Sequence, residues 1–394
     1  MQALDGIRVV DLSHAISGPT CTNMLVQLGA DVIKVEKPGV GDVFRHYTEH
    51  AGLPMMSIPF AAINAGKKSL TLDIRKPEGR GIFFRLLADA DVLVENFKPG
   101  TLARIGLSPA SLRERFPRLI TCSISGFGQT GPLASRGAYD HIAQASSGLS
   151  MMNSVGDTPQ KIGIPIVDSF SGYIAVIGVM AAIQRRATTG QGEDIDVSML
   201  DSALKLLNTS VATYFATGEI PKGLGNRGYR LVATSEFYRT ADGWIALGAN
   251  QQHQIEKMCE VIGRPDLLAD PRFADHASRV QNYDALKAWL TDFFATQSAE
   301  DLEERLSAVG VPIAMIRDIG QIAHHPQLDA RGTLRDGEMP EGQPAVKIVG
   351  TGFETGAPTS QGTVPVLGAD SDTILAQLGL DAEAIAALRR QAVI

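Results

Sequence analysis

The segment that decides the fold is IRVVDL at residues 7–12, followed by a helix-like run from Thr20 to Leu28, by Gly29, and by VIKV at residues 32–35. Both β-rich runs are almost continuously apolar, which is typical of strands buried on two faces in a parallel sheet. Gly29 is a common residue at the end of a helix. The segment therefore predicts a β-α-β unit and an α/β fold.

The same alternation continues through the first half of the chain. Pro77 opens a helical stretch to Ala88, residues 91–94 have the pattern of a strand, Thr101 to Ile105 has that of a helical turn, and residues 119–123 have that of another strand. We therefore expect a doubly wound, mostly parallel sheet.

The pattern changes after about Leu224. A glycine-rich stretch precedes a hairpin expected at residues 236–247, which turns at Asp242-Gly243. Helical patterns between residues 254 and 309 and a short strand at 313–316 predict a second, α+β domain that ends near Pro326. A strand at 345–349 and a helix at 371–391 either finish this domain or return to the first.

Composition narrows the class of protein. The 394 residues are 44% hydrophobic and carry a formal charge of −7, so the chain is long enough for two domains and general nucleic-acid binding is not expected. Its cysteines, Cys21, Cys122 and Cys259, fit no disulfide framework. The N-terminus lacks a secretory pattern, and the apolar run from Tyr173 to Ile183 is too short for a bilayer. We expect a soluble, cytoplasmic protein with no membrane association.

One motif suggests a dinucleotide site, because GFGQTG at residues 126–131 follows an expected strand. Its context differs from that of a nicotinamide-binding turn: Pro132 follows at once, and no acidic residue closes a next strand at the required spacing. We therefore predict no NAD. We expect the glycines instead to let the backbone approach a ligand or a neighbouring chain closely.

Asp168 lies between a short apolar run and a long apolar helix expected from Tyr173 to Arg186. An Asp at a helix start commonly caps the helix by accepting amide hydrogen bonds. The same amides and the helix dipole would keep a reactive carboxylate ionised and could stabilise an oxyanion. Small neighbours, Ser169, Ser171 and Gly172, leave room for a substrate. Sequence alone keeps both interpretations open.

Polar and basic residues recur after strand ends, where open α/β sheets bind ligands. They are His14, Lys37, Asn96 and Lys98, with Arg75, Arg104 and Arg136 nearby in the sequence. Their repeated position suggests a polyanionic ligand such as a nucleotide diphosphate. His324-His325 lacks further ligands at metal spacing, so no metal is expected, and the GxSxG turn of a serine hydrolase does not occur.

The chain also resembles the class III CoA-transferases, which include formyl-CoA, carnitine and succinyl-CoA:dicarboxylate transferases. The resemblance covers nearly the whole chain and is most specific in the first half. It rests on LDGIRVVDLSH at residues 4–14, LGADVIKVE at 28–36, VENF at 94–97, SGFG at 125–128, Tyr139-Asp140, the segment from Gly163 through Pro165 to Asp168, and TGQG at 189–192.

This resemblance implies a Rossmann-like large domain (residues 1–224 and 330–394), a small α+β domain (225–329), and two subunits interlocked as rings in a homodimer. It implies that Asp168 is a nucleophile that carries first an acyl group and then CoA. It also implies CoA contacts from two sets of residues: His14, Ala15, Ile16, Ser17, Lys37, Leu72, Asp73, Ile74 and Arg75; and Asn96, Phe97, Lys98, Arg104, Arg136, Gly137, Ala138, Tyr139 and Asp140.

Departures from the family pattern bear on the substrates. Ile16 replaces a residue that is often polar in formyl-CoA transferase, which argues against oxalate and formate. A pocket offering Arg45, His46, Arg227 or Arg230 would suit a second carboxylate. We therefore expect succinyl-CoA as the donor and itaconate, mesaconate, citramalate or glutarate as the acceptor.

Two alternatives remain. An α-methylacyl-CoA racemase needs a second proton-transfer group, and the family's His aligns with Tyr139, whose phenol is a poor base near neutral pH. A non-catalytic acyl-CoA-binding protein would not need the intact segment from Gly163 to Asp168.

Overall fold

The computed structural model describes residues 1–47, 56–228, 232–340, 345–356, 359 and 362–394. The chain divides into two compact units. Unit 1 comprises residues 1–150, 161–219 and 327–394, and unit 2 comprises residues 151–160 and 220–326.

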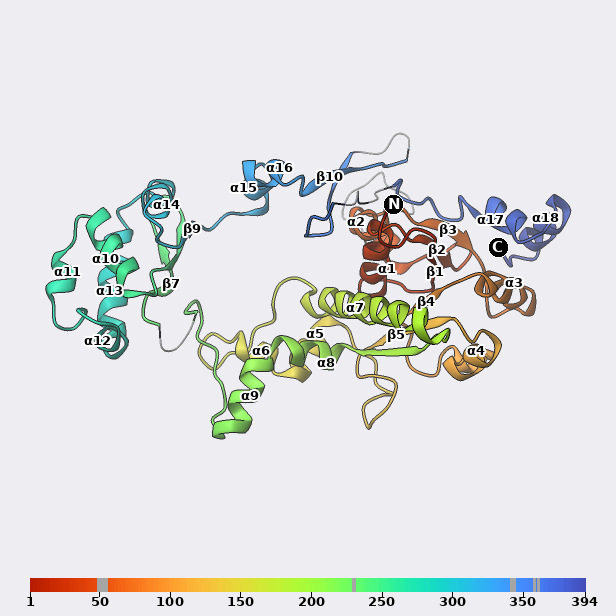
Figure 1. The fold of residues 1–394 in the computed structure, drawn as a ribbon, viewed down its shortest axis with the longest axis horizontal. Coiled ribbons are helices and arrows are strands. Elements are labelled where there is room, and N and C mark those ends of the chain that lie inside the picture. Colours follow the sequence, from red (N-terminus) through yellow and green to blue (C-terminus); the bar gives the residue numbers. More distant parts are fainter. Residues whose placement is uncertain (48–55, 229–231, 341–344, 357–358, 360–361) are drawn as a thin grey trace. The chain divides into compact units, whose positions relative to one another are not determined.

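Unit 1 is built on a six-stranded parallel sheet (Figure 1). Its strands are β1 (Arg8–Asp11), β2 (Asp31–Glu36), β3 (Lys68–Thr71), β4 (Val92–Glu95), β5 (Ile120–Ser125) and β6 (Asp194–Ser198). Their spatial order is β3-β2-β1-β4-β5-β6, with every neighbouring pair parallel. The order reverses between β1 and β4, which is the doubly wound Rossmann arrangement. The predicted α/β fold is confirmed.

Helices cover both faces of this sheet because its strands are apolar on both sides. Val9 packs in the core below α1 and α7, whereas its neighbour Val10 packs in the core below α3 and α17. The helices of unit 1 are α1 (Ser17–Gln27), α2 (Ile58–Asn64), α3 (Pro77–Ala88), α4 (Pro109–Arg115), α5 (Asp140–Ser147), α7 (Ile166–Thr189), α8 (Met199–Leu206), α9 (Asn208–Thr217), α17 (Ser371–Gln377) and α18 (Ala382–Arg390). Shorter elements are η1 (Val43–His46), η2 (Ala103–Ile105), α6 (Leu149–Met152) and α16 (Pro326–Ala330).

Helix α7 is longer than the sequence pattern suggested. It begins at Ile166 rather than Tyr173, and its 24 residues are long and apolar enough, by length and composition alone, to cross a bilayer. The expectation of an apolar run too short for a membrane was therefore wrong about length. One face of α7 is buried, and Gly172 allows close packing on α1, since a Cβ there would lie 2.6 Å from the Ser17 carbonyl oxygen.

Unit 2 has its own core around an antiparallel sheet in the order β7-β8-β9. Its strands are β7 (Ser235–Arg239), β8 (Trp244–Gly248) and β9 (Ile313–Met315). Its helices are α10 (Gln252–Val261), α11 (Asp266–Ala269), α12 (His276–Gln281), α13 (Tyr283–Phe294), α14 (Ala299–Ala308) and α15 (Ile319–Ala323). The predicted hairpin corresponds to β7 and β8.

The C-terminal segment returns to the large sheet. Strands β10 (Leu334–Gly337) and β11 (Val346–Val349) pair antiparallel, and α17 contacts β3. The single helix expected at 371–391 is two helices, α17 and α18, because Gly379 adopts a left-handed conformation (φ +85°) between them.

Candidate active site

The carboxyl ends of β1 and β4 meet at the point where the strand order reverses, and two loops are tied together there. The backbone N–H of His14 donates to Asn96 Oδ1 (2.9 Å), and Asn96 Nδ2 donates to the His14 carbonyl (2.8 Å) and to Ser17 Oγ (3.2 Å). The His14 ring packs on Phe97 with centroids 5.4 Å apart. Open α/β sheets bind ligands at this reversal, so these loops form one wall of a candidate site.

The loop after β1 has an unusual backbone conformation. Ala15 has φ +61°, a region that side chains rarely adopt, and its N–H donates to Asp42 Oδ1 at 2.9 Å. Asp42 Oδ1 also accepts from the N–H of Phe44. Asp42 therefore holds the loop in a bend that carries the chain from β1 into α1.

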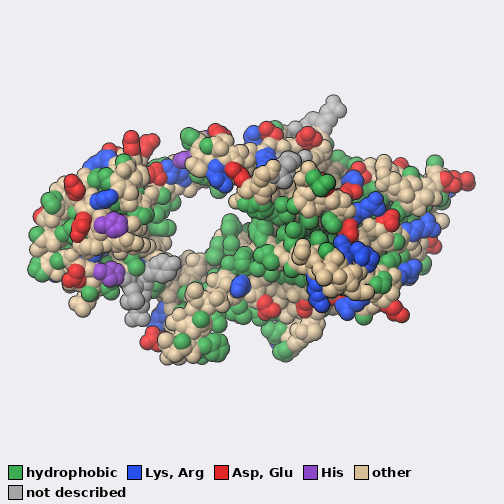
Figure 2. Space-filling view, viewed as in Figure 1, with side chains coloured by type: hydrophobic (Ala, Val, Ile, Leu, Met, Phe, Trp, Pro, Cys, Tyr) green, Lys and Arg blue, Asp and Glu red, His purple; other side chains and the backbone are tan. Residues whose placement is uncertain are grey.

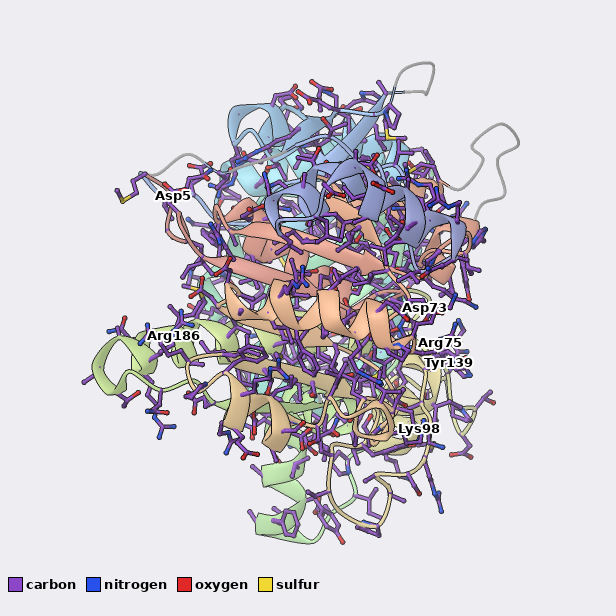
Figure 3. The ribbon with its side chains drawn as sticks, turned by 90° about the vertical axis from the view of Figure 1, so that its right-hand side faces the viewer. Asp5, Asp73, Arg75, Lys98, Tyr139 and Arg186 are labelled. Carbon is purple, nitrogen blue, oxygen red and sulfur yellow. The ribbon has the colours of Figure 1, made fainter. Side chains whose placement is uncertain are left out.

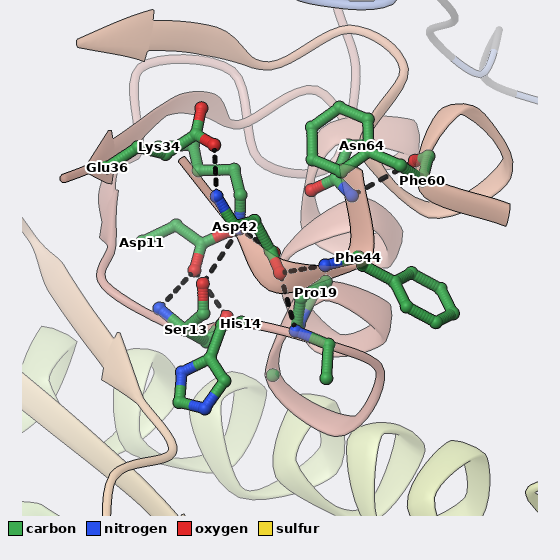
Figure 4. A network of polar contacts seen from close by, with 12 residues as sticks. Asp11, Ser13, His14, Pro19, Lys34, Glu36, Asp42, Phe44, Phe60 and Asn64 are labelled. Carbon is green, nitrogen blue, oxygen red and sulfur yellow. Dashed lines mark hydrogen bonds and ion pairs between the residues drawn. The ribbon is translucent and has the colours of Figure 1, made fainter. Parts of the chain in front are cut away.

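A buried network of charges supports this bend (Figure 4). Lys34 Nζ lies 2.9 Å from Asp42 Oδ2 and donates to the Ser13 carbonyl (2.7 Å), while Lys67 Nζ lies 3.0 Å from Asp11 Oδ2. Burial alone would raise the pKa of Asp11, but Lys34 and Lys67 hold that pKa far below its ordinary value. Burial lowers the pKa of Lys67 to about 8 despite Asp11. The charges are paired because isolated charges at this depth would be costly.

A pocket of about 380 Å³ opens at the carboxyl ends of β1 to β4. Seven residues expected to contact CoA line it: Lys37, Leu72, Asp73, Ile74, Arg75, Phe97 and Arg104. Its walls are largely apolar, with Leu12, Val35, Leu102 and Ile105 among them. The lining also holds Lys37, Arg104, Glu36 and the ion pair of Arg75 with Asp73. Apolar walls with a basic rim suit a nucleotide whose base is buried and whose phosphates stay near solvent.

Of the remaining residues expected to contact CoA, His14, Ser17 and Asn96 belong to the tied loops that follow β1 and β4. In Figure 3, Asp73, Arg75, Lys98 and Tyr139 lie on one side of the molecule, and Asp5 and Arg186 lie on the other. Lys98 lines a smaller neighbouring cavity. Arg136, Gly137 and Tyr139 are exposed, and Ala138 and Asp140 are partly buried.

The glycine motif at 126–131 shapes this side of the site. A Cβ on Gly126 would lie 2.4 Å from the Ala138 Cβ, and Gly128 and Gly131 adopt left-handed conformations. The motif therefore allows the segment that contains Tyr139 to approach the end of β5.

Asp168 lies in the first turn of α7, one helical turn before Gly172. Residues four apart share a helix face, and Gly172 packs on Ser17, so Asp168 lies beside the loop that precedes α1. The helix is not capped by Asp168, because Pro165 occupies the N-cap position. Asp140 Oδ1 instead accepts from the N–H groups of Val167 (2.8 Å) and Asp168 (3.1 Å).

The Asp168 carboxylate accepts no hydrogen bond from any residue that the structure describes. Burial, with a further contribution from the negative charge of Asp140, raises the pKa of Asp168 to about 7. The expectation that free helix amides keep this group ionised was wrong, because Asp140 occupies those amides. The result is a partly exposed carboxylate with elevated basicity, as expected for a nucleophile or proton acceptor near neutral pH.

The four residues suggested for the acceptor carboxylate belong to different parts of the chain, and two of them, Arg45 and His46, lie in unit 1. Arg45 is buried, its Nε and one terminal nitrogen each bond Glu36 at 2.8 Å, and it stacks over Phe60. A guanidinium held in this way is not available to a substrate, so the geometry argues against that role. His46 is exposed and contacts the Val40 carbonyl.

The other two suggested residues belong to a different part of the chain. Arg227 lies in unit 2, where it stacks over Tyr283 at 3.8 Å and donates to the Val232 carbonyl. Arg230 lies outside the described residues. In the part of the chain that is described, no cluster of three or more His, Cys, Asp or Glu side chains could hold a metal ion.

Sequence reasoning missed the buried support of the site. Lys34, Asp42 and Lys67 were not singled out as a network, and Asp140 was expected to contact CoA rather than to cap α7. Charged residues inside the apolar strands were the available signal, because a charge at a buried position requires a partner.

Comparison with known proteins identifies the family. The family described as CoA-transferase family III matches residues 4–371. An acetyl-CoA:oxalate CoA-transferase of Acetobacter aceti is 39% identical over 88% of this chain and 89% of its own length. A succinyl-CoA:mesaconate CoA-transferase of Haloarcula hispanica is 35% identical over 96% of this chain and 97% of its own. The crystal structure of a CAIB/BAIF family protein from Brucella suis superposes with a TM-score of 0.86, at 35% identity, over 96% of this chain and 99% of that one.

Proposed function

Because the chain belongs to CoA-transferase family III and is an acyl-CoA:carboxylate CoA-transferase, we propose that Asp168 is its nucleophile and that the pocket at the ends of β1 to β4 holds CoA. The observation that carries the proposal is the unbonded Asp168 carboxylate, in the first turn of α7 beside the loop of residues 14–17.

The proposed reaction proceeds by four acyl transfers. An Asp168 oxygen attacks the thioester carbon, the C–S bond breaks, and a mixed anhydride and CoA thiolate form. The thiolate attacks the Asp168 carbonyl of the anhydride, which releases the donor carboxylate and leaves an aspartyl-CoA thioester. The acceptor carboxylate then attacks this thioester to form a second mixed anhydride. Thiolate attack on the acceptor carbonyl yields the new acyl-CoA and regenerates Asp168.

The residues around Asp168 have separate tasks in this proposal. Lys37 and Arg104 bind the phosphates at the pocket rim, and Leu72 and Ile74 pack against the base. Arg75 is exposed beside them but already bonds Asp73 through two nitrogens. The tied loops of His14 and Asn96 fix the wall between the pocket and Asp168. Holding CoA at both ends keeps its thiolate beside the anhydride during the intermediate steps.

For the substrates we propose succinyl-CoA as donor and a small dicarboxylate as acceptor. The mesaconate enzyme of Haloarcula hispanica, which matches nearly the whole chain, supports this class. The relative with 39% identity is named for acetyl-CoA and oxalate, so these two belong in any substrate test despite the apolar Ile16. A panel of acyl-CoAs against mono- and dicarboxylates, with products identified by mass spectrometry, decides the pair.

We also propose that a second copy of the chain covers the outer face of α7. Tyr173 and Ile177 are 46% and 65% exposed, and an apolar pocket of about 770 Å³ lies between α1, α7 and the segment around Phe353. Hydrophobic side chains gather over α7 in Figure 2. An apolar area of this kind on a water-soluble protein marks an interface, and an interlocked homodimer would cover it.

The direct test of the proposed chemistry traps the intermediate. Incubation with acyl-CoA followed by hydroxylamine should convert the Asp168 carboxyl group to a hydroxamate, which adds about 15 Da to the peptide that contains it. Asp168→Asn should show neither the adduct nor transfer. Full transfer activity in Asp168→Asn, with the fold intact, would exclude the covalent role.

A further inference from the structure

Asp140 occupies a position that bears directly on Asp168. Its Oδ1 accepts from the N–H groups of Val167 and Asp168, which are two of the free amides at the start of α7. These amides would otherwise be available to the carboxylate of Asp168 itself. Asp140 therefore takes the hydrogen bonds that would make Asp168 a stable, weakly basic anion.

A second residue holds Asp140 in this position. Gln144, fully buried one turn later on α5, donates to Asp140 Oδ2 at 2.5 Å. Its Oε1 accepts from the N–H of Ile162 at 2.8 Å. Asp140 and Gln144 together therefore bind the segment that leads into α7, and both oxygens of Asp140 have hydrogen-bond partners.

We propose that Asp140 is a positioning residue for the transfer reaction: it caps α7 in place of Asp168 and so leaves the Asp168 carboxylate without a hydrogen bond from the described residues. This inference rests on the proposed role of Asp168 as nucleophile. The two carboxylates have different environments: both oxygens of Asp140 accept hydrogen bonds, whereas the Asp168 carboxylate accepts none from the described residues. Different environments give two carboxylates different roles.

The arrangement has a chemical consequence. A carboxylate with a higher pKa is a stronger nucleophile toward a thioester once it is ionised, but a larger fraction of it is protonated below neutral pH. Burial and the negative charge of Asp140 are the two causes of the raised pKa of Asp168. If the charge of Asp140 is removed, its contribution to the pKa of Asp168 should disappear, whereas the contribution of burial should remain.

The test compares the pH dependence of kcat/KM in wild type and Asp140→Asn. Asn retains an oxygen that can cap α7 but has no charge. The acid limb, near pH 7 in the wild type, should move to lower pH by about one unit, since a neighbouring like charge shifts a carboxyl pKa by about that amount or more. The plateau rate at high pH should fall several-fold, so the two profiles cross. Ionisation of the substrates affects both enzymes equally, so it does not contribute to the difference between the two pH profiles.

A second variant distinguishes the loss of charge from the loss of a hydrogen bond that supports the fold. In Asp140→Asn, the new side-chain NH2 group can face the NH2 group of Gln144, so that two donors meet. Adding Gln144→Glu replaces the Gln144 donor by an acceptor and restores a donor–acceptor pair. The double variant keeps the bond between positions 140 and 144 and the bond from the Ile162 N–H, loses the long bond (3.4 Å) from Gln144 Nε2 to the Ile162 carbonyl, and moves the charge one turn away along α5. Its acid limb should lie between those of wild type and Asp140→Asn.

The outcomes separate this inference from the proposed function. An unchanged acid limb in a folded, active Asp140→Asn enzyme would overturn the inference while leaving Asp168 as nucleophile. Loss of rate at all pH values without any shift of the limb would show a structural cap only, and would also overturn it. Transfer by Asp168→Asn would instead remove the proposed function itself.

Discussion

Asn96 and His14 exchange two hydrogen bonds, of 2.9 and 2.8 Å, across the reversal of strand order between β4 and β1. This contact joins the loop that follows β1 to the loop that follows β4, beside the pocket proposed to hold CoA. Because both bonds use the Asn96 amide, one side chain determines how the loops sit relative to each other.

Asn96→Ala should therefore lower kcat/KM about 10- to 100-fold, with a smaller effect on stability, because buried hydrogen bonds of this kind contribute about 1 kcal/mol each. Asn282→Ala is a matched control: that amide also bonds backbone carbonyls, but in unit 2. Steady-state kinetics measures the effect. Equal losses in both variants would show that the Asn96 contact has no specific role at the site.

The left-handed conformation of Ala15 gives a second prediction. Glycine adopts φ +61° at little cost, whereas a β-branched residue does not. Ala15→Gly should keep activity within about two-fold, and Ala15→Val should destabilise the protein by about 1–3 kcal/mol and impair acyl-CoA binding. Thermal melting and KM for acyl-CoA measure these effects. A fully active, equally stable Ala15→Val enzyme would contradict the described loop.

The buried charge network should contribute far more to the stability of the fold than an ion pair on the surface. Asp11→Asn would leave Lys34 and Lys67 buried without their common partner, at a cost of about 3–5 kcal/mol. Asp31→Asn removes an exposed pair with Lys68 and should cost less than about 1 kcal/mol. Denaturant unfolding of both variants tests the difference, which should vanish if the network is open to water.

Acyl-CoA affinity should depend on the cations at the pocket rim. Arg104 is exposed, and among the described residues its guanidinium donates only to Thr101 Oγ1, at 3.2 Å, so its removal should spare the fold. Arg104→Ala should raise KM for acyl-CoA about 10-fold with kcat nearly unchanged, and the effect should shrink at high salt. Arg390→Ala, on α18 outside the pocket, is the control. An unchanged KM for Arg104→Ala would place the phosphates elsewhere.

The raised pKa of Asp168 predicts a cost in stability. Folding raises this pKa from an ordinary 3.8 to about 7, so between these values the folded protein holds a proton that the unfolded chain releases. Stability is therefore lost as pH rises through this window, and the cost is complete above pH 7. Asp168→Asn should be more stable than wild type at pH 8, by about 1–2 kcal/mol after allowance for partial exposure, and no more stable at pH 4. Melting curves at both pH values test the sign.

Much of the fold followed from the sequence because its strands are nearly continuous apolar runs. The strands at 7–12, 32–35, 91–94 and 119–123 were predicted close to their positions. Strand β3 and strand β6 were missed, since Lys68 and two aspartates interrupt their apolar pattern. The start of α7 was placed seven residues late because Pro165 and the small residues after it resemble a loop.

The site was only partly predictable. Residues that follow strand ends were found, since parallel strands bring their carboxyl ends to one edge. The cap of α7 was not, because Asp140 lies 28 residues before Asp168 and no local pattern joins them. Arg45 shows the reverse error: a basic residue near a site in sequence can be bound entirely to its own protein.

Oxygen atoms can be followed from the acceptor carboxylate to Asp168. In the proposed reaction each turnover leaves one acceptor oxygen on Asp168, so an acceptor labelled with ¹⁸O in its carboxylate should add about 2 Da, and after many turnovers about 4 Da, to the peptide that contains Asp168. The proposed reaction predicts this label at Asp168 alone. Complete turnover of labelled acceptor with an unlabelled Asp168 peptide would contradict it.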